Sequence, residues 1–237
     1  MAVRAILAAL DNGGRMYILH YTPDAASLVV RIVLTELGQP FDTVLLDRDK
    51  GQHDSAAYRA LQPLGLVPAL ETSDGPMFET AAILLWLADR HQAMAPAAAD
   101  ADRGDFLKWM FFVNNSVHPT LLQLFYPHRV AGDSCVTQVT AHARDRLAEY
   151  LGLLDRTVAQ APRWSDAAQP TVLGHYIGQL LRWMQFGGPG TATRFPIADY
   201  PALRAMAEAL EQRPAVQAAA RAETLGPAVY TDPDRVG

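Results

Sequence analysis

The residues best placed to do chemistry form one short stretch, Gln62 to Leu70, followed nine residues later by the pair Glu79-Thr80. The Val67-Pro68 peptide removes one backbone donor and is a place where a cis bond can be selected. A sharp turn there leaves the N–H and C=O groups of Val67 open to an extended peptide. Glu79 and Thr80 open a helical run, so a hydroxyl and unpaired N–H groups face outward at a positive helix end. Together these residues predict a clamp for a peptide that carries a carboxylate.

The elements around this stretch are predicted to follow a βαβαββα order. Strands are expected at 17–20, 41–46, 66–70 and 76–78, and helices at 25–37, 56–61 and 81–91. A helix separates the first two strands, so they must be parallel, whereas a short loop ending in Asp74-Gly75 makes the last two antiparallel. This order predicts a thioredoxin-like α/β domain.

The composition changes at an Ala/Pro/Asp-rich connector, and beyond it the apolar residues repeat only at helical spacing. These repeats cover 105–125, 137–160, 171–185 and 201–212. We therefore predict an N-terminal extension (1–15), a thioredoxin-like domain (16–92), a linker (93–102) and an all-α helical-bundle domain (103–237).

Composition excludes several classes of function. The 237 residues are 50% hydrophobic and 19% charged, as in an ordinary globular protein, and a net charge of −5 offers no basic surface for nucleic acid or an anionic membrane. The single cysteine, Cys135, excludes an internal disulfide, and seven scattered histidines argue against a metal site. The N-terminus falls short of a secretory signal and no apolar run could span a bilayer, so a cytoplasmic protein is expected.

Several motifs together resemble the cytosolic glutathione S-transferases. These motifs are Tyr17 to Pro23, Pro63 to Leu70, Phe78 to Ala88, Leu180 to Trp183 and Tyr200 to Arg204. The chain looks most similar to beta-like or unclassified bacterial members that lack the catalytic cysteine. Met16 looks like the residue at which members of the family usually begin, which is why residues 1–15 are treated as an extension. The resemblance also implies a homodimer.

The resemblance implies a glutathione transferase that binds reduced glutathione as a co-substrate and joins its thiolate to a small hydrophobic electrophile. It assigns Val67 and Pro68 to main-chain docking of the tripeptide. Glu79 is assigned to the ammonium of the γ-glutamyl end, and Thr80 to its carboxylate. In the charged loop, Lys50 and His53 are candidates for the glycyl carboxylate.

Ionising the bound thiol needs a hydroxyl donor near the positive end of the first helix. The beta-class pattern Tyr-x-Pro-Gly-Ala-Cys-Ser-Leu aligns with Tyr21 to Leu28, and the cysteine position is occupied by Ala26. Mixed-disulfide chemistry is therefore not expected. Ser27 and Tyr21 are both candidates to activate the thiol, and the sequence leaves the choice between them open.

In the helical domain, Asn114, Asn115 and His118 share roughly one side of a helix. The beta class carries a His-Lys pair near the sulfur at this point, and this chain has His118 followed by Pro119. We therefore expect His118 near the thiol and a helix kinked at the proline. Asn114 and Asn115, with Tyr126 and Arg129, are expected to wall the pocket of the second substrate.

Two alternatives are also compatible with the sequence. A glutathione-dependent reductase of disulfides or hydroperoxides would have to use glutathione itself as the thiol. A binding or interaction module without turnover is also compatible, because a fold does not fix a function. The intact Glu79-Thr80 pair argues against the module, whereas alanines at positions 25 and 26 argue for it.

Overall fold

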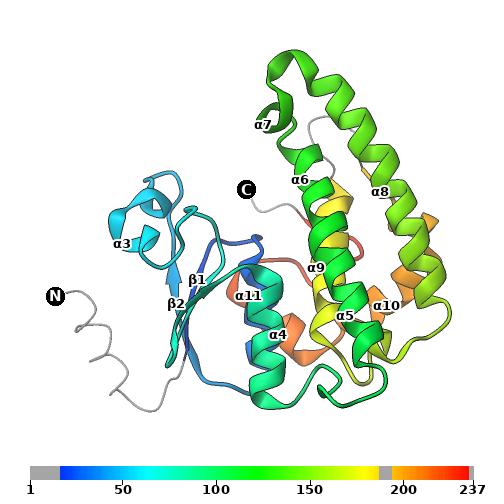
Figure 1. Cartoon of the computed structure of the whole chain (residues 1–237), viewed down its shortest axis with the longest axis horizontal. Coiled ribbons are helices and arrows are strands. Elements are labelled where there is room, and N and C mark those ends of the chain that lie inside the picture. Colours follow the sequence, from blue (N-terminus) through cyan, green and yellow to red (C-terminus); the bar gives the residue numbers. More distant parts are fainter. Residues whose placement is uncertain (1–16, 187–193, 235–237) are drawn as a thin grey trace. The chain divides into compact units, whose positions relative to one another are not determined.

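The computed structural model describes residues 17–186 and 194–234 (Figure 1). The predicted extension, residues 1–15, lies outside the described residues. The chain divides into two compact units, Met1–His91 and Gln92–Gly237, and each is described by itself.

The first unit is built on a four-stranded sheet in the order β2-β1-β3-β4 (Figure 1). Its strands are β1 (Tyr17–Tyr21), β2 (Phe41–Leu45), β3 (Ala69–Thr72) and β4 (Gly75–Phe78). β1 pairs in parallel with β2, and β3 pairs antiparallel with both β1 and β4. The predicted directions of both strand pairs are confirmed.

Three α-helices complete this unit and confirm the predicted βαβαββα order. They are α2 (Ser27–Glu36), α3 (Ala56–Arg59) and α4 (Thr80–His91). Helix α2 packs against both β1 and α4. It therefore buries more than one face, and its fully buried apolar residues are Leu28, Val29, Val30, Ile32, Val33 and Leu34. Each such side chain stabilises the fold by about 1.5–3 kcal/mol.

The third strand differs from its predicted range. A strand was expected over residues 66–70, but β3 begins at Ala69. Pro68 has no N–H to donate to a neighbouring strand, so regular pairing starts after it. Residues 66–68 are left as an irregular segment at the edge of the sheet.

The second unit is helical, and its described residues contain no strand. Its α-helices are α5 (Arg103–Phe112), α6 (His118–Phe125), α7 (His128–Ala131), α8 (Val136–Val158), α9 (Val172–Phe186), α10 (Pro201–Glu211) and α11 (Pro214–Ala222). A π-helical turn, Val113–Val117, joins α5 to α6. Because Pro119 lacks an N–H, the helix cannot keep its regular hydrogen bonding here. A kink was predicted at this proline, and the structure has the π-helical turn just before it. Helix α11 was not predicted from periodicity.

Helix α9 is buried on nearly all sides, including its charged residue. Arg182 is 0% exposed and donates to the main-chain carbonyls of Val229 (3.0 Å) and Asp234 (3.1 Å). On α10, buried Glu211 accepts hydrogen bonds from the N–H of Tyr230 (3.0 Å) and the hydroxyl of Thr231 (2.7 Å). Two buried charges therefore hold the last described segment of the chain.

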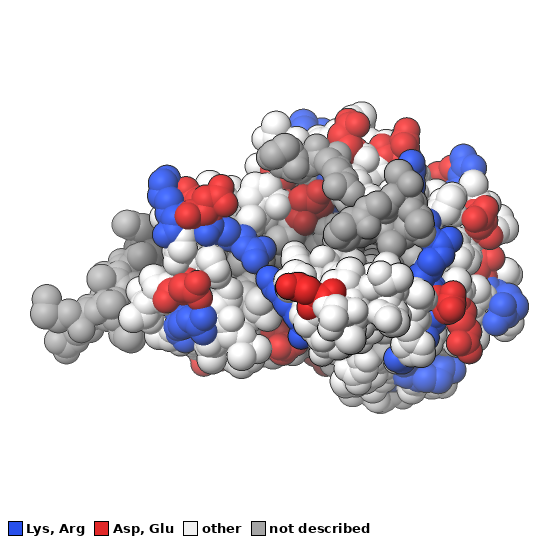
Figure 2. All heavy atoms as spheres, turned by 90° about the horizontal axis from the view of Figure 1, so that it is seen from above, with Lys and Arg blue, Asp and Glu red and all other residues white. Residues whose placement is uncertain are grey.

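On the face drawn in Figure 2, Lys and Arg side chains are interspersed with Asp and Glu. Within residues 17–186 and 194–234, no helix combines the length and apolar character needed to cross a membrane.

Candidate active site

One end of the sheet, where β1 and β4 finish and β3 begins, collects segments that are far apart in the sequence. We call this end the sheet edge. The antiparallel register pairs Ala69 with His20 on one side and with Phe78 on the other. Neighbouring strands lie about 4.8 Å apart, so the segments that leave the sheet at this edge are neighbours. These segments carry four of the residues predicted from the sequence, namely Tyr21, Val67, Glu79 and Thr80.

Val67 presents its main chain at this edge. The Val67-Pro68 peptide is cis. The Val67 side chain is half-buried and packs against a small core cluster of Leu46, Tyr58 and Ala69. No described residue forms a hydrogen bond with the N–H or C=O of Val67. The side chain thus anchors the residue, while its two main-chain groups remain available to an extended peptide.

Glu79 and Thr80 stand at the start of α4. Glu79 is exposed and has φ +71°, a left-handed conformation that few residues other than glycine adopt. Its carbonyl accepts from the N–H of Ile83 (3.0 Å), so Glu79 occupies the cap position and Thr80 is the first helical residue. The first N–H groups of α4 have no partner within the helix and lie at its positive end. Strained conformations of this kind concentrate at functional sites.

Ser27, a candidate for thiol activation, is the first residue of α2. Its side chain is 0% exposed, and its hydroxyl donates to the Thr22 carbonyl (3.2 Å). That bond closes the turn between β1 and α2. The hydroxyl would have to leave this partner before it could donate to a sulfur atom.

Tyr21, the other candidate, ends β1 at the sheet edge and is half-buried. The guanidinium of Arg31, one turn beyond the start of α2, lies 4.4 Å from the centroid of the Tyr21 ring. A cation over the ring face is attracted by the electron density there and fixes the orientation of the ring. Tyr21 is therefore held at the edge that also carries Val67 and Glu79.

Lys50 and His53 belong to the loop between β2 and α3. Lys50 is exposed and pairs with Asp47 (2.8 Å), which raises the pKa of the lysine and lowers that of the aspartate. His53 Nε2 lies 3.3 Å from Asp54, while its Nδ1 is buried and has no hydrogen-bond partner. The nearby Arg59 lowers the pKa of Asp54, which stays ionised.

The helical unit contains a second polar cluster, formed by Asn114, His118 and Tyr176. The Tyr176 hydroxyl donates to Asn114 Oδ1 (3.2 Å) and lies 2.6 Å from His118 Nδ1. A tyrosine has one hydroxyl hydrogen, so in this arrangement His118 Nδ1 carries a proton and donates it. Burial lowers the pKa of His118 to about 4, so its Nε2 is an unprotonated acceptor at neutral pH.

The remaining predicted residues of this unit are spread over the π-helical turn, the end of α6 and α7. Asn115 is exposed, and its Oδ1 accepts from Asn114 (2.9 Å). Tyr126 ends α6, and the guanidinium of the exposed Arg129 lies 4.1 Å from its ring centroid. Across the described part of the chain, no three His, Cys, Asp or Glu side chains are grouped as a metal site would require.

Three residues that no sequence pattern identified hold these candidates in place. Arg31 orients Tyr21, Tyr176 orients His118, and Tyr58 packs beneath Val67. Tyr176 and Tyr58 sit within apolar helical patterns, where an aromatic residue indicates ordinary packing. No sequence pattern distinguished their hydroxyl groups from those of other core tyrosines.

The sheet edge therefore combines the parts that a peptide thiol would need. It offers two main-chain groups at Val67, a carboxylate at Glu79, a helix N-terminus at Thr80 and a phenol at Tyr21. Such a site can hold an extended peptide and stabilise an anion.

Comparison with known proteins agrees with this chemistry. Residues 25–90 match the family model described as glutathione S-transferase, N-terminal domain. Glutathione S-transferase F10 of Arabidopsis thaliana is 30% identical over 154 residues, which cover 61% of this chain and 71% of that protein. Glutathione S-transferase GstA of Escherichia coli O157:H7 is 27% identical over 212 residues, 87% of this chain and 98% of its own length.

A solved structure extends the similarity to the fold. The sphingomonad glutathione S-transferase complexed with glutathione is 31% identical, with a TM-score of 0.72. The match covers 88% of this chain and all of that one.

Proposed function

Because this chain belongs to the glutathione S-transferase family, we propose that the sheet edge at Val67, Glu79 and Thr80 is its glutathione site. The chain is a glutathione transferase with glutathione as its co-substrate. The observation that carries the assignment is the register that brings an unpaired main-chain segment and a helix N-terminus to one edge.

In this proposal the tripeptide lies extended along the edge. Its cysteinyl main chain pairs with the N–H and C=O of Val67, and Pro68 follows without a competing donor. The carboxylate of the γ-glutamyl end meets the N–H groups and hydroxyl of Thr80, and Glu79 pairs with the ammonium. Lys50 and His53 take the glycyl carboxylate, for which Lys50 offers an exposed ammonium.

We assign thiol activation to Tyr21 in the first instance and keep Ser27 as the second candidate. Tyr21 lies at the glutathione edge, whereas the Ser27 hydroxyl is buried and already donates to Thr22. A phenol donating to the sulfur stabilises the thiolate over the thiol. If the assignment is correct, Tyr21→Phe slows turnover at neutral pH by about 10- to 100-fold and Ser27→Ala has a smaller effect.

The reaction is a substitution or addition by the bound thiolate. In a substitution, the sulfur forms a bond to carbon of the electrophile and the leaving group departs with the electron pair of the bond that breaks. In an addition, the sulfur bonds to one carbon of a multiple bond, the electron pair of that bond moves to its far atom, and that atom takes a proton from water. Positioning and anion stabilisation supply the rate increase, and no side chain becomes covalently attached.

The helical unit supplies the residues proposed for the second substrate. His118, held by Tyr176, offers Nε2 as a hydrogen-bond acceptor, and Asn114 and Asn115 add amide groups. Tyr126 with Arg129 adds an aromatic and a cationic surface. A small hydrophobic electrophile with a polar substituent fits this set of side chains.

We also propose that the protein is a cytoplasmic homodimer. The exposed apolar residues Phe111 (52%) on α5 and Leu122 (41%) on α6 support a protein contact on this part of the helical unit. Analytical ultracentrifugation of wild type and Phe111→Glu checks the assembly. A monomeric wild type contradicts it.

The deciding experiment for the glutathione site is calorimetric titration with reduced glutathione. Wild type should bind, and Glu79→Ala should lose about 10- to 100-fold in affinity because the ammonium loses a charged partner. Glu149→Ala, which removes the same charge from an exposed position on α8, is the control. Wild-type binding should be followed by turnover of a chlorodinitrobenzene.

Absence of wild-type binding at millimolar glutathione would overturn the site and favour an interaction module. Binding without turnover of the aromatic electrophile, together with reduction of a hydroperoxide, would favour the reductase.

A further inference from the structure

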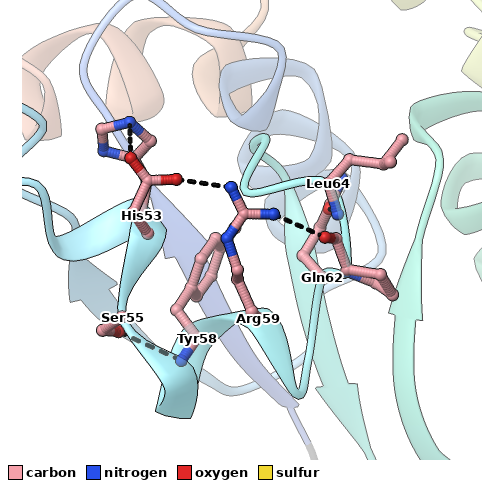
Figure 3. Close-up of polar contacts among 8 residues, drawn as sticks. His53, Ser55, Tyr58, Arg59, Gln62 and Leu64 are labelled. Atoms are coloured by element: carbon pink, nitrogen blue, oxygen red, sulfur yellow. Dashed lines mark hydrogen bonds and ion pairs between the residues drawn. The ribbon is translucent and has the colours of Figure 1, made fainter.

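The residues that lead into Val67 are tied to α3 and to the turn that follows it. Arg59 Nη1 donates to the Pro63 carbonyl (2.8 Å), and Gln62 Oε1 accepts from the N–H of Leu64 (2.6 Å). Figure 3 shows Arg59 and Gln62 directed toward this segment. Two successive main-chain positions are thus held by side chains.

The next two positions are held as well. The N–H of Gly65 donates to the Gln62 carbonyl (3.0 Å), and the Tyr58 hydroxyl donates to the Leu66 carbonyl (2.5 Å). Four consecutive residues are therefore fixed through their main chains. Val67 is the first residue after them whose main chain has no hydrogen-bond partner among the described residues.

Tyr58 is itself fixed by burial, by a main-chain hydrogen bond and by a contact with another ring. It is 3% exposed, its N–H donates to the Ser55 hydroxyl (3.2 Å), and its ring lies 5.6 Å from that of His20 in β1. His20 is in turn bonded to Glu71 of β3 (2.7 Å). Burial raises the pKa of Tyr58, so the hydroxyl keeps its proton and remains a donor. Packing against His20 of the sheet therefore holds the Tyr58 ring in place, and the Tyr58 hydroxyl in turn holds the Leu66 carbonyl.

Arg59 connects the same segment to the charged loop. Its Nη2 lies 2.6 Å from Asp54 Oδ1, and the other carboxylate oxygen of Asp54 lies 3.3 Å from His53 Nε2 (Figure 3). One chain of polar contacts thus reaches from the proposed glycyl contact at His53 to the segment that presents Val67. Arg59 is half exposed, so solvent weakens its contribution compared with that of Tyr58.

We infer that Tyr58 and Gln62, supported by Arg59, are positioning residues that set the main chain of Val67 for glutathione. They do not touch the tripeptide in this inference, which rests on the proposed function. Preorganised main-chain groups bind a peptide more tightly because less ordering is required on binding. Loss of one anchor should weaken glutathione binding more than it slows the chemical step.

The first test is Tyr58→Phe, which keeps the ring in the core and removes only the hydroxyl. The KM for glutathione should rise about fivefold, while kcat at saturating glutathione stays within about twofold of wild type. The calorimetric Kd should rise in parallel with KM. Tyr150→Phe removes a hydroxyl bonded to Arg146 on α8 and is the matched control, with no change expected in either constant.

The second test compares two substitutions of Gln62 and does not depend on Tyr58→Phe folding. Gln62→Met has a similar length but no acceptor for the N–H of Leu64, so KM should rise about fivefold. Gln62→Glu keeps an acceptor oxygen at that position. Because Gln62 is only 2% exposed, the new carboxyl group should lower the stability of the protein, but the KM of the folded variant should stay closer to wild type than that of Gln62→Met. A general loss of packing would not be rescued in this way.

The outcomes separate the inference from the proposed function. If wild type binds glutathione but Tyr58→Phe and Gln62→Met leave KM unchanged, or lower kcat with KM unchanged, the positioning role is wrong. If wild type does not bind glutathione, the proposed function fails and the inference fails with it.

Discussion

Replacing Gly65 by alanine tests whether the segment before Val67 must lie against the turn at His53 and Asp54, which precedes α3. Gly65 has φ +66°, and an added Cβ would lie 2.9 Å from the main-chain oxygen of His53. It would also lie 3.3 Å from Arg59 Nη2 and from Asp54 Oδ1. The first contact is with backbone and cannot be relieved by rotating a side chain. Relief of the clash therefore requires the main chain at Gly65 or the main chain at His53 to shift.

Gly38 provides a matched control, because it has φ +63° but nothing within 4 Å of an added Cβ. In both variants, the left-handed backbone destabilises the folded state by about 1–2 kcal/mol. Alanine also reduces the conformational entropy of the unfolded chain, which offsets about 0.4–1 kcal/mol of that cost. Gly38→Ala should therefore lower the free energy of unfolding by about 1 kcal/mol. The clash at Gly65 adds about 1–3 kcal/mol of overpacking, for a total of about 3 kcal/mol.

The assay is urea denaturation followed by far-UV circular dichroism, with the KM for glutathione measured on the folded variants. We expect Gly65→Ala to be the less stable variant and the one with a raised KM, because its segment carries Val67. Equal stability losses for Gly38→Ala and Gly65→Ala would refute the reasoning. They would show that the segment has room to accept a methyl group.

Two further predictions concern the helical unit. The pKa of His118 is about 4 in the folded protein against an ordinary 6.5, so the unfolded chain binds more protons between these values. The free energy of unfolding should therefore fall by about 3 kcal/mol as the pH drops from 6.5 to 4, and His118→Gln should flatten a plot of stability against pH. Parallel plots for the two proteins would contradict this. Arg182→Met removes the donors to Val229 and Asp234, and it should cost about 2–4 kcal/mol and open the last segment to limited proteolysis. Arg204→Met, which removes an exposed pair on α10, should cost less than about 0.5 kcal/mol, and similar losses for both would argue against the buried role.

Local sequence patterns determined most of the fold. Apolar spacing located α2, α8, α9 and α10 to within about two residues, because side-chain periodicity follows directly from helix geometry. The Asp74-Gly75 hairpin and the helix between β1 and β2 fixed strand direction, since chain connectivity alone requires it. The residues proposed for the clamp were predicted for the same reason, because Val67-Pro68 and Glu79-Thr80 are each short local signatures.

Other features depended on contacts that no local pattern encodes. Helix α11 is nine residues long, and its propensity alone could not set it apart from an Ala-rich tail. Ser27 and Tyr21 were equivalent by position. Only the packing showed that one hydroxyl is buried against Thr22 and that the other residue lies at the sheet edge beside Arg31.

The sequence by itself therefore determined the order and direction of the elements and which short motifs could bind a peptide carboxylate. The tertiary structure decided which of those motifs meet, because strand register joins Tyr21, Val67 and Glu79 across more than fifty residues of chain. The tertiary structure also decided which polar side chains form hydrogen bonds with other residues. Tyr58 and Tyr176 acquired their roles from neighbours distant in sequence, and hydrogen bonds of that kind exist only once the chain has folded.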